Sequence, residues 1–508
     1  MDFSSLFKKL MGKHWGVHPA DHKRPAADQP VHAVPLPPRL HLMLSQHVGA
    51  AARPVVLVGQ KVKKGELIAA SQGKISAPLH APTSGVIGAI GEITAPHTSG
   101  LPAMAITLTV DGEDRWIEPE NLPADPYALA PADVAARVAA AGVVGMGGAT
   151  FPSSVKLNLG RRSDIDTLII NGSECEPYLS CDDRLMRDKA AEIVSGIRLM
   201  LVATGAGCAK VGIEDNKPEA IAAMGEAARG FDNITIVPVP ARYPMGSDRQ
   251  LIVELTGREV PSDARAADVG VIVHNVGTAR AVHDAVVLGR PLVSRLVTVN
   301  GAAAAMPGNY EVPLGMLVSD LIAFTGGAKG EVARLVMGGP MMGTLLPHAR
   351  VPVVKGTSGI LLLDAKEAEA LEPEACIRCS SCVKACPMGL LPLEMSARIR
   401  NDDLEGAMDL GLADCIACGC CAYVCPSHIP LVQYFYHAKG DLSARERAKL
   451  RTESTKKLGV ARQERLEREA REKAEAAARR KAERAAQQAA AAAAAAPAST
   501  EPQKGEIA

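Results

Sequence analysis

The chain has 508 residues, 47% of them hydrophobic and 3% aromatic, and its 56 Lys and Arg balance its 56 Asp and Glu. This length leaves room for about three or four domains, and the zero net charge argues against a nucleic-acid partner held by bulk electrostatics. No run of about 18 uncharged apolar residues occurs, so we expect no transmembrane helix. The first residues lack the apolar core and cleavage site of a signal peptide, so we expect no export signal.

Residues 1–40 are predicted to form a leader rich in His and Pro, and residues 41–120 a module of short strands separated by Gly and Pro turns. The two halves of this module, with matching elements at 59–65 and 81–85, resemble the barrel-sandwich hybrid of biotinyl and lipoyl carrier domains. Lys74 stands near a turn but lacks the Met-Lys-Met setting of a modified carrier lysine. We expect a β docking module, with a modified Lys74 as the alternative.

Residues 121–290 show a different pattern, in which apolar strands such as 166–172 and 208–214 alternate with helical segments. This alternation predicts a mostly parallel sheet covered by helices on both faces, and therefore an α/β domain. Residues 291–348 are predicted to form a small β-grasp (SLBB-like) module. Residues 441–508 form a charged, Ala-rich tail with few apolar residues to bury, so we expect a solvated helix or a disordered segment.

The cysteines are unevenly placed, since nine of the twelve lie between Cys376 and Cys425. This clustering in a large chain without a predicted export signal favours metal ligation over disulfides. Two runs, which begin at Cys376 and Cys415, both fit C-x2-C-x2-C-x3-C-P, the bacterial ferredoxin spacing for 4Fe–4S clusters. Zinc is the alternative, but it takes two pairs of ligands, whereas each run supplies a triplet and a fourth cysteine before Pro.

The fourth cysteine of each run is expected to bind the cluster of the other run, which defines two sets of ligands. The first set consists of Cys376, Cys379, Cys382 and Cys425, and the second set consists of Cys386, Cys415, Cys418 and Cys421. Cys420 falls outside the spacing and is expected to pack as a bystander. Residues 349–440 are therefore predicted to be a bacterial two-cluster ferredoxin domain that passes single electrons.

Two loops of the α/β region are candidates for nucleotide binding. Residues 145–156 combine several glycines with Lys156, and such a segment lets backbone N–H groups and a cation approach a phosphate. Its spacing matches neither the Rossmann nor the P-loop fingerprint, so a plain tight loop is the alternative. Residues 171–178 follow a buried strand, at the edge where α/β sheets bind ligands. Their acids and amide suit ribityl, ribose or isoalloxazine groups, and an exposed turn is the alternative.

Together the segments GMGGATFPSSVK and NGSECEP resemble the flavin- and NADH-binding fold of the NADH-oxidising subunit of respiratory complex I. Residues 274–278 are similar to a later flavin-contacting loop of that subunit. Met146 and Ser173 stand where complex I carries Arg and Asp. A closer resemblance, over most of residues 1–440, is to the C subunit of the Rnf (Rsx) electron-transport complex, and it includes residues 212–218 and 338–343.

This resemblance implies a subunit of an oxidoreductase and translocase that couples electron transfer between NAD(H) and ferredoxin-type carriers to ion movement. It implies FMN, NAD(H) and two 4Fe–4S clusters as cofactors, and the other Rnf subunits and ferredoxin as partners. No residue is assigned to acid–base catalysis. The residues implied to hold FMN are Gly145, Gly147, Gly148, Lys156, Asn171, Glu174, Asn275 and Thr278. Those implied to face the nicotinamide nucleotide or line the same pocket are Phe151, Glu176, Glu214, Asn216 and Lys217.

The resemblance also implies peripheral attachment to the cytoplasmic face of the bacterial inner membrane. Phe3, Leu6, Phe7 and Leu10 recur at helical spacing and offer an apolar face for such attachment, with a packed or frayed terminus as the alternative. Three other functions remain open from the sequence: a pure iron–sulfur relay, an assembly scaffold of the complex, and a soluble diaphorase of a hydrogenase.

Overall fold

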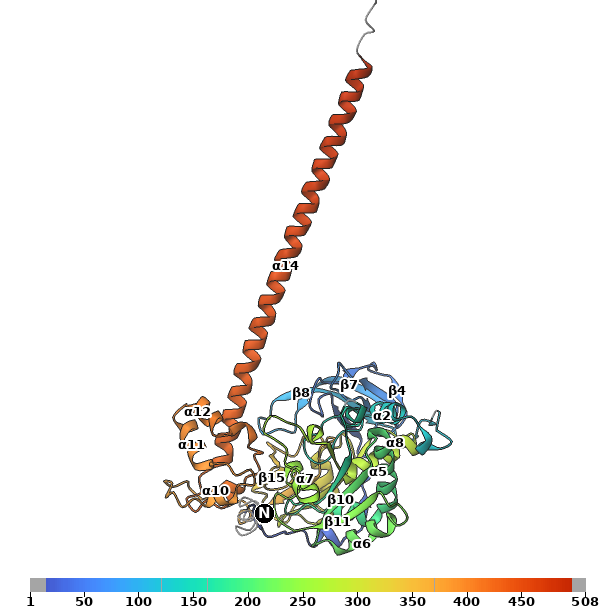
Figure 1. Ribbon diagram of the computed structural model, residues 1–508. Helices are drawn as coiled ribbons and strands as arrows, with labels where there is room; N and C mark the ends of the chain where they lie inside the picture. Colours follow the sequence, from blue (N-terminus) through green and yellow to red (C-terminus); the bar gives the residue numbers. More distant parts are fainter. Residues whose placement is uncertain (1–14, 120, 162, 370, 496–508) are drawn as a thin grey trace, which may run out of the picture. The chain divides into compact units, whose positions relative to one another are not determined.

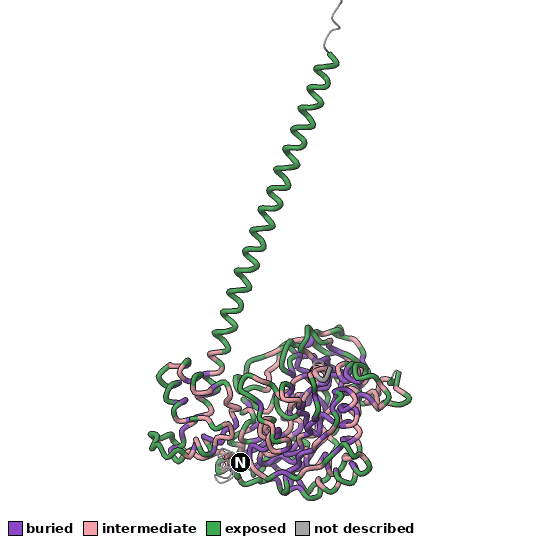
Figure 2. Tube along the Cα trace, in the orientation of Figure 1, coloured by how far each residue is buried: buried purple, intermediate pink, exposed green. Residues whose placement is uncertain are grey.

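A computed structural model of the chain describes residues 15–119, 121–161, 163–369 and 371–495 (Figure 1). The chain divides into two units, and the boundary follows Phe435. Buried residues are concentrated in the first unit, whereas the helix of the second unit is exposed from residue 443 onward (Figure 2). Among the described helices, none combines the length and the apolarity that are needed to span a membrane.

The first module is built of two small antiparallel sheets, as the predicted barrel-sandwich hybrid requires. One sheet has the order β2 (Arg39–Met43), β8 (Pro102–Val110), β7 (Gly85–Thr94) and β4 (Lys61–Val62). The other has the order β3 (Arg53–Pro54), β5 (Leu67–Ala70) and β6 (Leu79–His80). Alternate side chains of the longer strands, such as Leu40 and Leu42, are fully buried between the sheets. Lys74 is exposed in the connection between β5 and β6.

The α/β domain contains a four-stranded parallel sheet in the order β11 (Ile234–Val239), β10 (Cys208–Glu214), β9 (Thr167–Gly172) and β12 (Val271–Asn275). Its helices are α2 (Pro131–Ala140), α3 (Ser153–Leu157), α4 (Cys181–Asp188), α5 (Ala190–Thr204), α6 (Pro218–Ala227), α7 (Asp248–Thr256) and α8 (Val276–Val287). Along β9, Leu168 and Ile170 pack in the core that α5 and α8 cover, whereas Ile169 packs with Leu251 of α7. Both faces of the sheet are therefore covered, as predicted.

The β-grasp module is completed by strands from outside its predicted segment of residues 291–348. Its sheet has the order β1 (Val31–Ala33), β14 (Gly308–Pro313), β13 (Ser294–Asn300), β17 (Gly359–Leu363), β15 (Arg334–Met337) and β16 (Thr344–Leu345), and helix α9 (Val318–Phe324) connects β14 to β15. Strand β17 lies in the middle of this sheet, between β13 and β15. Its apolar side chains from Ile360 to Leu362 are fully buried there. Strand β1 comes from the leader and is too short to show a period in the sequence.

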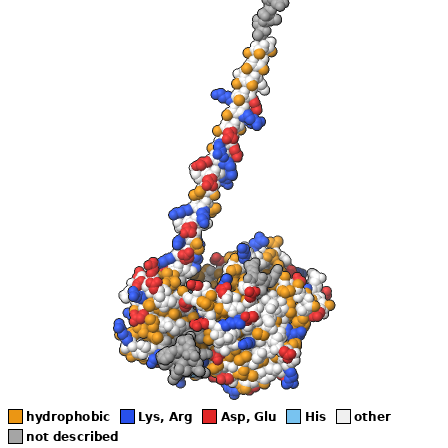
Figure 3. Space-filling view, viewed as in Figure 1, with side chains coloured by type: hydrophobic (Ala, Val, Ile, Leu, Met, Phe, Trp, Pro, Cys, Tyr) orange, Lys and Arg blue, Asp and Glu red, His pale blue; other side chains and the backbone are white. Residues whose placement is uncertain are grey.

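The cysteine-rich region consists of short helices joined by loops: α10 (Ser381–Ala385), α11 (Pro392–Arg400), α12 (Leu404–Asp409) and α13 (Cys420–Tyr423). The chain then enters α14 (Leu431–Ala494), so the tail is helical over most of its length. Residues 443–495 are exposed throughout, and Figure 3 shows acidic and basic side chains interspersed along this helix. Pairs such as Arg479 with Glu483 follow the i,i+4 spacing that favours a solvated helix.

Candidate functional site

The glycine-rich segment forms a closed loop between α2 and α3. The backbone N–H of Gly145 donates to the carbonyl of Phe151 over 2.8 Å, and the N–H of Met146 donates to the hydroxyl of Thr278 over 3.0 Å. Gly148 has a φ of 120°, a backbone conformation that favours glycine, and open space surrounds the position of a Cβ atom there. The loop is thus fixed against the start of α8 and leaves room for a ligand beside its backbone.

Two buried hydroxyl groups near this loop have no hydrogen-bond partner among the described residues. The hydroxyls of Ser153, at the start of α3, and of Ser173, directly after β9, are buried and make no hydrogen bond among the described residues. Lys156 donates to the carbonyl of Val273 over 3.2 Å, and burial lowers the pKa of its ammonium group. Since buried polar atoms are almost always paired, these groups fit a polar ligand such as FMN.

The acidic loop, residues 171–178, turns its side chains toward the protein. Asn171 donates to the carbonyl of Gly246 over 2.8 Å. The Glu174 carboxylate accepts the backbone N–H groups of Asp182 and Asp183 over 2.7 and 3.1 Å, and therefore caps the start of α4. This geometry makes Glu174 a residue that shapes the loop.

Glu176 connects the acidic loop to the segment Gly338–Gly343 of the β-grasp module. Its two carboxylate oxygens accept the backbone N–H groups of Met341 and Met342 over 3.0 and 2.8 Å. A Cβ atom at Gly339 would lie within 2.2 Å of the carboxylate, so only glycine permits this approach. Desolvation raises the pKa of Glu176 to about 7, although the two N–H groups act in the opposite direction.

Glu214 and Lys217 form a buried ion pair below the acidic loop. The Lys217 ammonium group lies 2.5 Å from the Glu214 carboxylate, 2.7 Å from the carbonyl of Ser173 and 3.2 Å from the side-chain oxygen of Asn216. Both side chains are only 3% exposed. Desolvation nevertheless raises the pKa of Glu214, which Lys217 opposes. These three predicted residues are therefore brought together beneath Ser173.

Lys23 supports the same loop, although it was not among the residues predicted to form the site. Its ammonium group donates to the backbone carbonyls of Glu174, Glu176 and Leu179 over 2.8, 2.9 and 2.6 Å, and the residue is 8% exposed. The neighbouring His22 ring stacks on Tyr178 at 4.7 Å between ring centres. A lysine in a polar, irregular leader carries no periodicity, so no signal in the sequence could have identified this contact.

The cysteines line two separate pockets of the ferredoxin-like region. The first set, Cys376, Cys379, Cys382 and Cys425, surrounds one pocket, and the second set, Cys386, Cys415, Cys418 and Cys421, surrounds the other. None of the twelve cysteines, all of which are described, forms a disulfide. Cys420 also lines the second pocket but is fully buried in an apolar cluster.

The second set lies against the acidic loop. Cys175 of that loop packs in one apolar cluster with Tyr243, Cys418 and Cys420. The Tyr243 hydroxyl donates to the carbonyl of Cys418 over 2.7 Å. On the neighbouring helix α7, the Gln250 amide donates to the carbonyl of Pro387 over 2.9 Å. The α/β domain therefore binds the backbone of the cysteine-rich region at Cys418 and next to Cys386.

Models of four domain families match consecutive parts of the chain. They are the RnfC barrel sandwich hybrid domain (residues 12–113), the Nuo51 FMN-binding domain (138–284), the SLBB domain (296–345) and the 4Fe–4S dicluster domain (375–429). FMN and 4Fe–4S clusters are therefore the cofactors of this chain, and the chain functions in electron transport. Among solved structures, an NAD+-reducing NiFe hydrogenase in the H2-reduced state covers 64% of this chain and 68% of its own at 21% identity and a TM-score of 0.45, which is too distant to carry an argument.

Curated relatives cover most of the chain. The C subunit of the ion-translocating oxidoreductase complex of Rhodobacter capsulatus is 50% identical over 85% of this chain and 84% of its own length. The proteins of the same name from Pseudomonas aeruginosa and Erwinia tasmaniensis are 47% and 42% identical over 89% and 92% of this chain, and over 58% of each relative. The chain therefore belongs to the family of C subunits of ion-translocating oxidoreductase complexes, as the resemblance predicted.

Proposed function

We propose that this subunit transfers electrons between NAD(H) and ferredoxin-type carriers inside its ion-translocating complex. FMN, when bound, exchanges two electrons with a nicotinamide and single electrons with an iron–sulfur centre. The observation that carries this proposal is the packing of Cys175, from the acidic loop, against the apolar cluster that contains Tyr243 and Cys418 of the second cysteine set. The acidic loop and the second cysteine set thereby share one apolar cluster.

The flavin would be held by the backbone of the glycine-rich loop and by polar groups around it. The unpartnered hydroxyls of Ser153 and Ser173 support this assignment. The side chains that we propose to contact it directly are Lys156, Asn171, Asn275 and Thr278, next to Gly145, Gly147 and Gly148. Phe151 and Asn216 would face the nicotinamide nucleotide, with Glu214 and Lys217 below them. Glu174 and Glu176 act here through the loop, because their carboxylates bind backbone N–H groups.

The eight cysteines of the two sets would hold two 4Fe–4S clusters, and the sets differ in their surroundings. Cys418 and Cys421 are buried beside the α/β domain, whereas Cys376 and Cys379 are exposed. We therefore propose that the second set exchanges electrons with the flavin site and that the first set exchanges them with a partner carrier. Because the rate of electron transfer falls with distance, an exposed set of cysteines is better placed to exchange electrons with a partner protein.

The complex is proposed to hold this subunit peripherally at the cytoplasmic face of the membrane, where NAD(H) and ferredoxin are available. The apolar pattern at Phe3, Leu6, Phe7 and Leu10 lies outside the described residues. Membrane fractions that are washed with carbonate test the attachment, because a peripheral subunit is released. Recovery of the subunit in the washed membranes would contradict it.

The function is tested by anaerobic spectra of the purified, reconstituted chain before and after NADH is added. We expect bleaching of the flavin and cluster absorbance. A relay without nucleotide chemistry would show the cluster absorbance but no bleaching with NADH. An assembly scaffold would also show no bleaching with NADH. Under that function, deletion of the tail would abolish the activity of the complex.

A further inference from the structure

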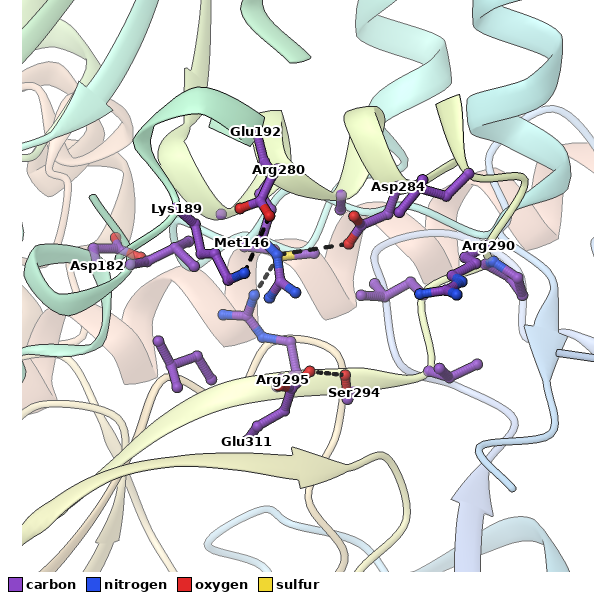
Figure 4. A pocket seen from close by; sticks show the side chains of 18 of the residues that line it. Met146, Asp182, Lys189, Glu192, Arg280, Asp284, Arg290, Ser294, Arg295 and Glu311 are labelled. Atoms are coloured by element: carbon purple, nitrogen blue, oxygen red, sulfur yellow. Dashed lines mark hydrogen bonds and ion pairs between the residues drawn. The ribbon is translucent and has the colours of Figure 1, made fainter. Parts of the chain in front are cut away.

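A charged cavity of about 240 Å³ lies where the α/β domain meets the β-grasp sheet (Figure 4). Helices α4 and α8 form one side of it and strands β13 and β14 the other. Met146 of the glycine-rich loop and Gly277 of α8 line its inner end, next to Asn275 and Thr278 of the proposed flavin site. None of the predicted site residues accounts for this cavity.

Three cationic side chains from different elements converge in this cavity. Lys189, Arg280 and Arg295 point toward one another in its middle, as Figure 4 shows. Lys189 and Arg280 have acidic partners on their own helices, Glu192 at 3.1 Å and Asp284 at 3.6 Å. These carboxylates compensate two of the three charges from the outer side of the cavity.

Arg295 lacks a comparable partner. The residue is 6% exposed, its Nε donates to the carbonyl of Thr357 over 3.2 Å, and another N–H contacts the sulfur of Met146. None of the ion pairs among the described residues includes Arg295, although the carboxyl group of Asp182 interacts with it electrostatically. Asp182, an acid that lines the same cavity, accepts the side-chain N–H of Asn275 over 2.5 Å, and desolvation raises the pKa of Asp182 to about 7. Glu311 is engaged by the hydroxyl of Ser294 over 3.0 Å.

Converging cations in a partly enclosed cavity repel one another unless an anion lies between them. A guanidinium group offers two parallel N–H donors that match the oxygens of a phosphate. The first turn of α8, with Gly277 at the cavity, adds the partial positive charge of a helix N-terminus. The arrangement therefore has the donors and the enclosure that a phosphate group requires, and Arg295 adds a charge that no ion pair among the described residues compensates.

We propose that this cavity binds the phosphate group of a nucleotide through Lys189, Arg280 and Arg295, and that FMN supplies the phosphate. The choice of FMN as the source of the phosphate rests on the proposed function, because Met146 and Gly277, which line the cavity, belong to the loops proposed to hold the flavin. A volume of about 240 Å³ is below the roughly 300–1,000 Å³ of pockets that enclose whole ligands, so the cavity holds one end of the cofactor.

The test compares FMN with riboflavin, which lacks the phosphate, on the full-length chain. Affinities are measured by quenching of flavin fluorescence for the wild type and for Arg295→Met, Arg295→Lys, Arg280→Met and Lys189→Met. We expect the Arg295→Met substitution to weaken FMN binding by about 10- to 100-fold, the usual effect of a lost charged hydrogen bond, and to leave riboflavin binding unchanged. Arg295→Lys should restore part of the difference, and the two partly exposed variants should give smaller losses.

Arg290→Met is the matched control, because Arg290 lines the same cavity but is exposed and lies over the Trp116 ring. It should bind both flavins like the wild type. Equal losses for FMN and riboflavin in the Arg280 and Lys189 variants would overturn the proposal and assign these residues a structural role. Selective loss of NADH affinity would keep the phosphate chemistry and identify a dinucleotide as its source. A wild type that binds FMN and riboflavin equally would overturn the phosphate site and leave the proposed function intact.

Discussion

The two regions that we propose to carry electrons are stabilised in opposite ways. The flavin region is assembled from loops that are far apart in the sequence, and buried charges such as Lys23 and the Glu214–Lys217 pair hold these loops together. The cysteine region is more local, because two short runs, at residues 376–386 and 415–425, supply all eight thiols around the two pockets. Substitutions at a distance should therefore damage the flavin region, whereas only substitutions of the ligands themselves should damage the cysteine region.

The largest effect is expected from a single ligand. Cys418→Ser removes one thiolate of the second set, so that cluster should be lost and the iron content should fall from about eight to about four atoms per chain. Electron transfer from NADH to the first set should then cease, while flavin reduction persists. Iron analysis and low-temperature EPR measure both effects.

Cys420→Ser is the matched control for that substitution, since Cys420 lines the same pocket but is expected to pack as a bystander. It should keep both clusters. Loss of a cluster in this variant, with retention of both in Cys418→Ser, would show that the ligand set is wrong and would remove the proposed contact between the flavin loop and a ligand.

Lys23→Met tests the dependence of the flavin region on distant residues. The substitution leaves three carbonyls of the acidic loop without their charged donor, so unfolding should become easier by about 2–4 kcal/mol, and FMN affinity should fall with it. Urea denaturation and flavin titration measure these changes. Lys74→Met, at an exposed lysine, should change neither.

If Lys23→Met kept full FMN affinity, FMN binding would not depend on the hydrogen bonds from Lys23 to the acidic loop. The contrast between the two regions would then be lost. The cluster absorbance provides an internal reference, because it should stay unchanged in this variant even when the flavin is released.

Substitution of Glu176 should have a smaller effect, a change in how stability depends on pH. Its pKa is raised from an ordinary value of 4.5 to about 7, so the folded chain binds more protons than the unfolded chain between these two values. Its contribution to stability is therefore fully present below pH about 4.5 and falls as the pH rises to about 7. Thermal unfolding across this range should show a flatter profile for Glu176→Gln than for the wild type.

Asp182 titrates in the same range, so the comparison of interest is the difference between the two proteins at each pH. A Glu176→Gln profile that is parallel to the wild-type profile would assign the fall to other groups. It would also mean that the contact between Glu176 and Met341 contributes little to the attachment of the loop.

The smallest effect is expected from the tail. Truncation after residue 442 removes residues that are exposed in the structure, so the stability of the first unit should change by less than about 0.5 kcal/mol. Cluster and flavin spectra should also stay the same, and only membrane recovery should change. Loss of NADH-dependent reduction after truncation would instead support the scaffold function.

Local patterns in the sequence predict most here. The parallel sheet, which alternating strands and helices predicted, is confirmed, and the two predicted sets of cysteines each line one pocket. The positions of Lys23, β1 and β17 could not be predicted, because each depends on a contact with a distant segment. The carboxylate of Glu176 is another example, since its partners, Met341 and Met342, lie 165 and 166 residues away.

The cavity around Arg295 shows the same limit. Met146 stands out in the sequence as a departure from complex I, but no signal there indicates that a strand of another module brings an arginine to that methionine. Charges that meet only after folding leave no pattern in the chain, whereas ligands of a cluster must keep their spacing to work at all.

The most direct test of the proposed function is the anaerobic absorbance spectrum of the chain, reconstituted with iron, sulfide and FMN, before and after NADH is added. We predict that NADH bleaches the absorbance of both the flavin and the clusters, and that Cys418→Ser limits the bleaching to the flavin. If the wild-type spectrum stayed unchanged with FMN bound and both clusters intact, the proposed electron transfer from NADH would be contradicted.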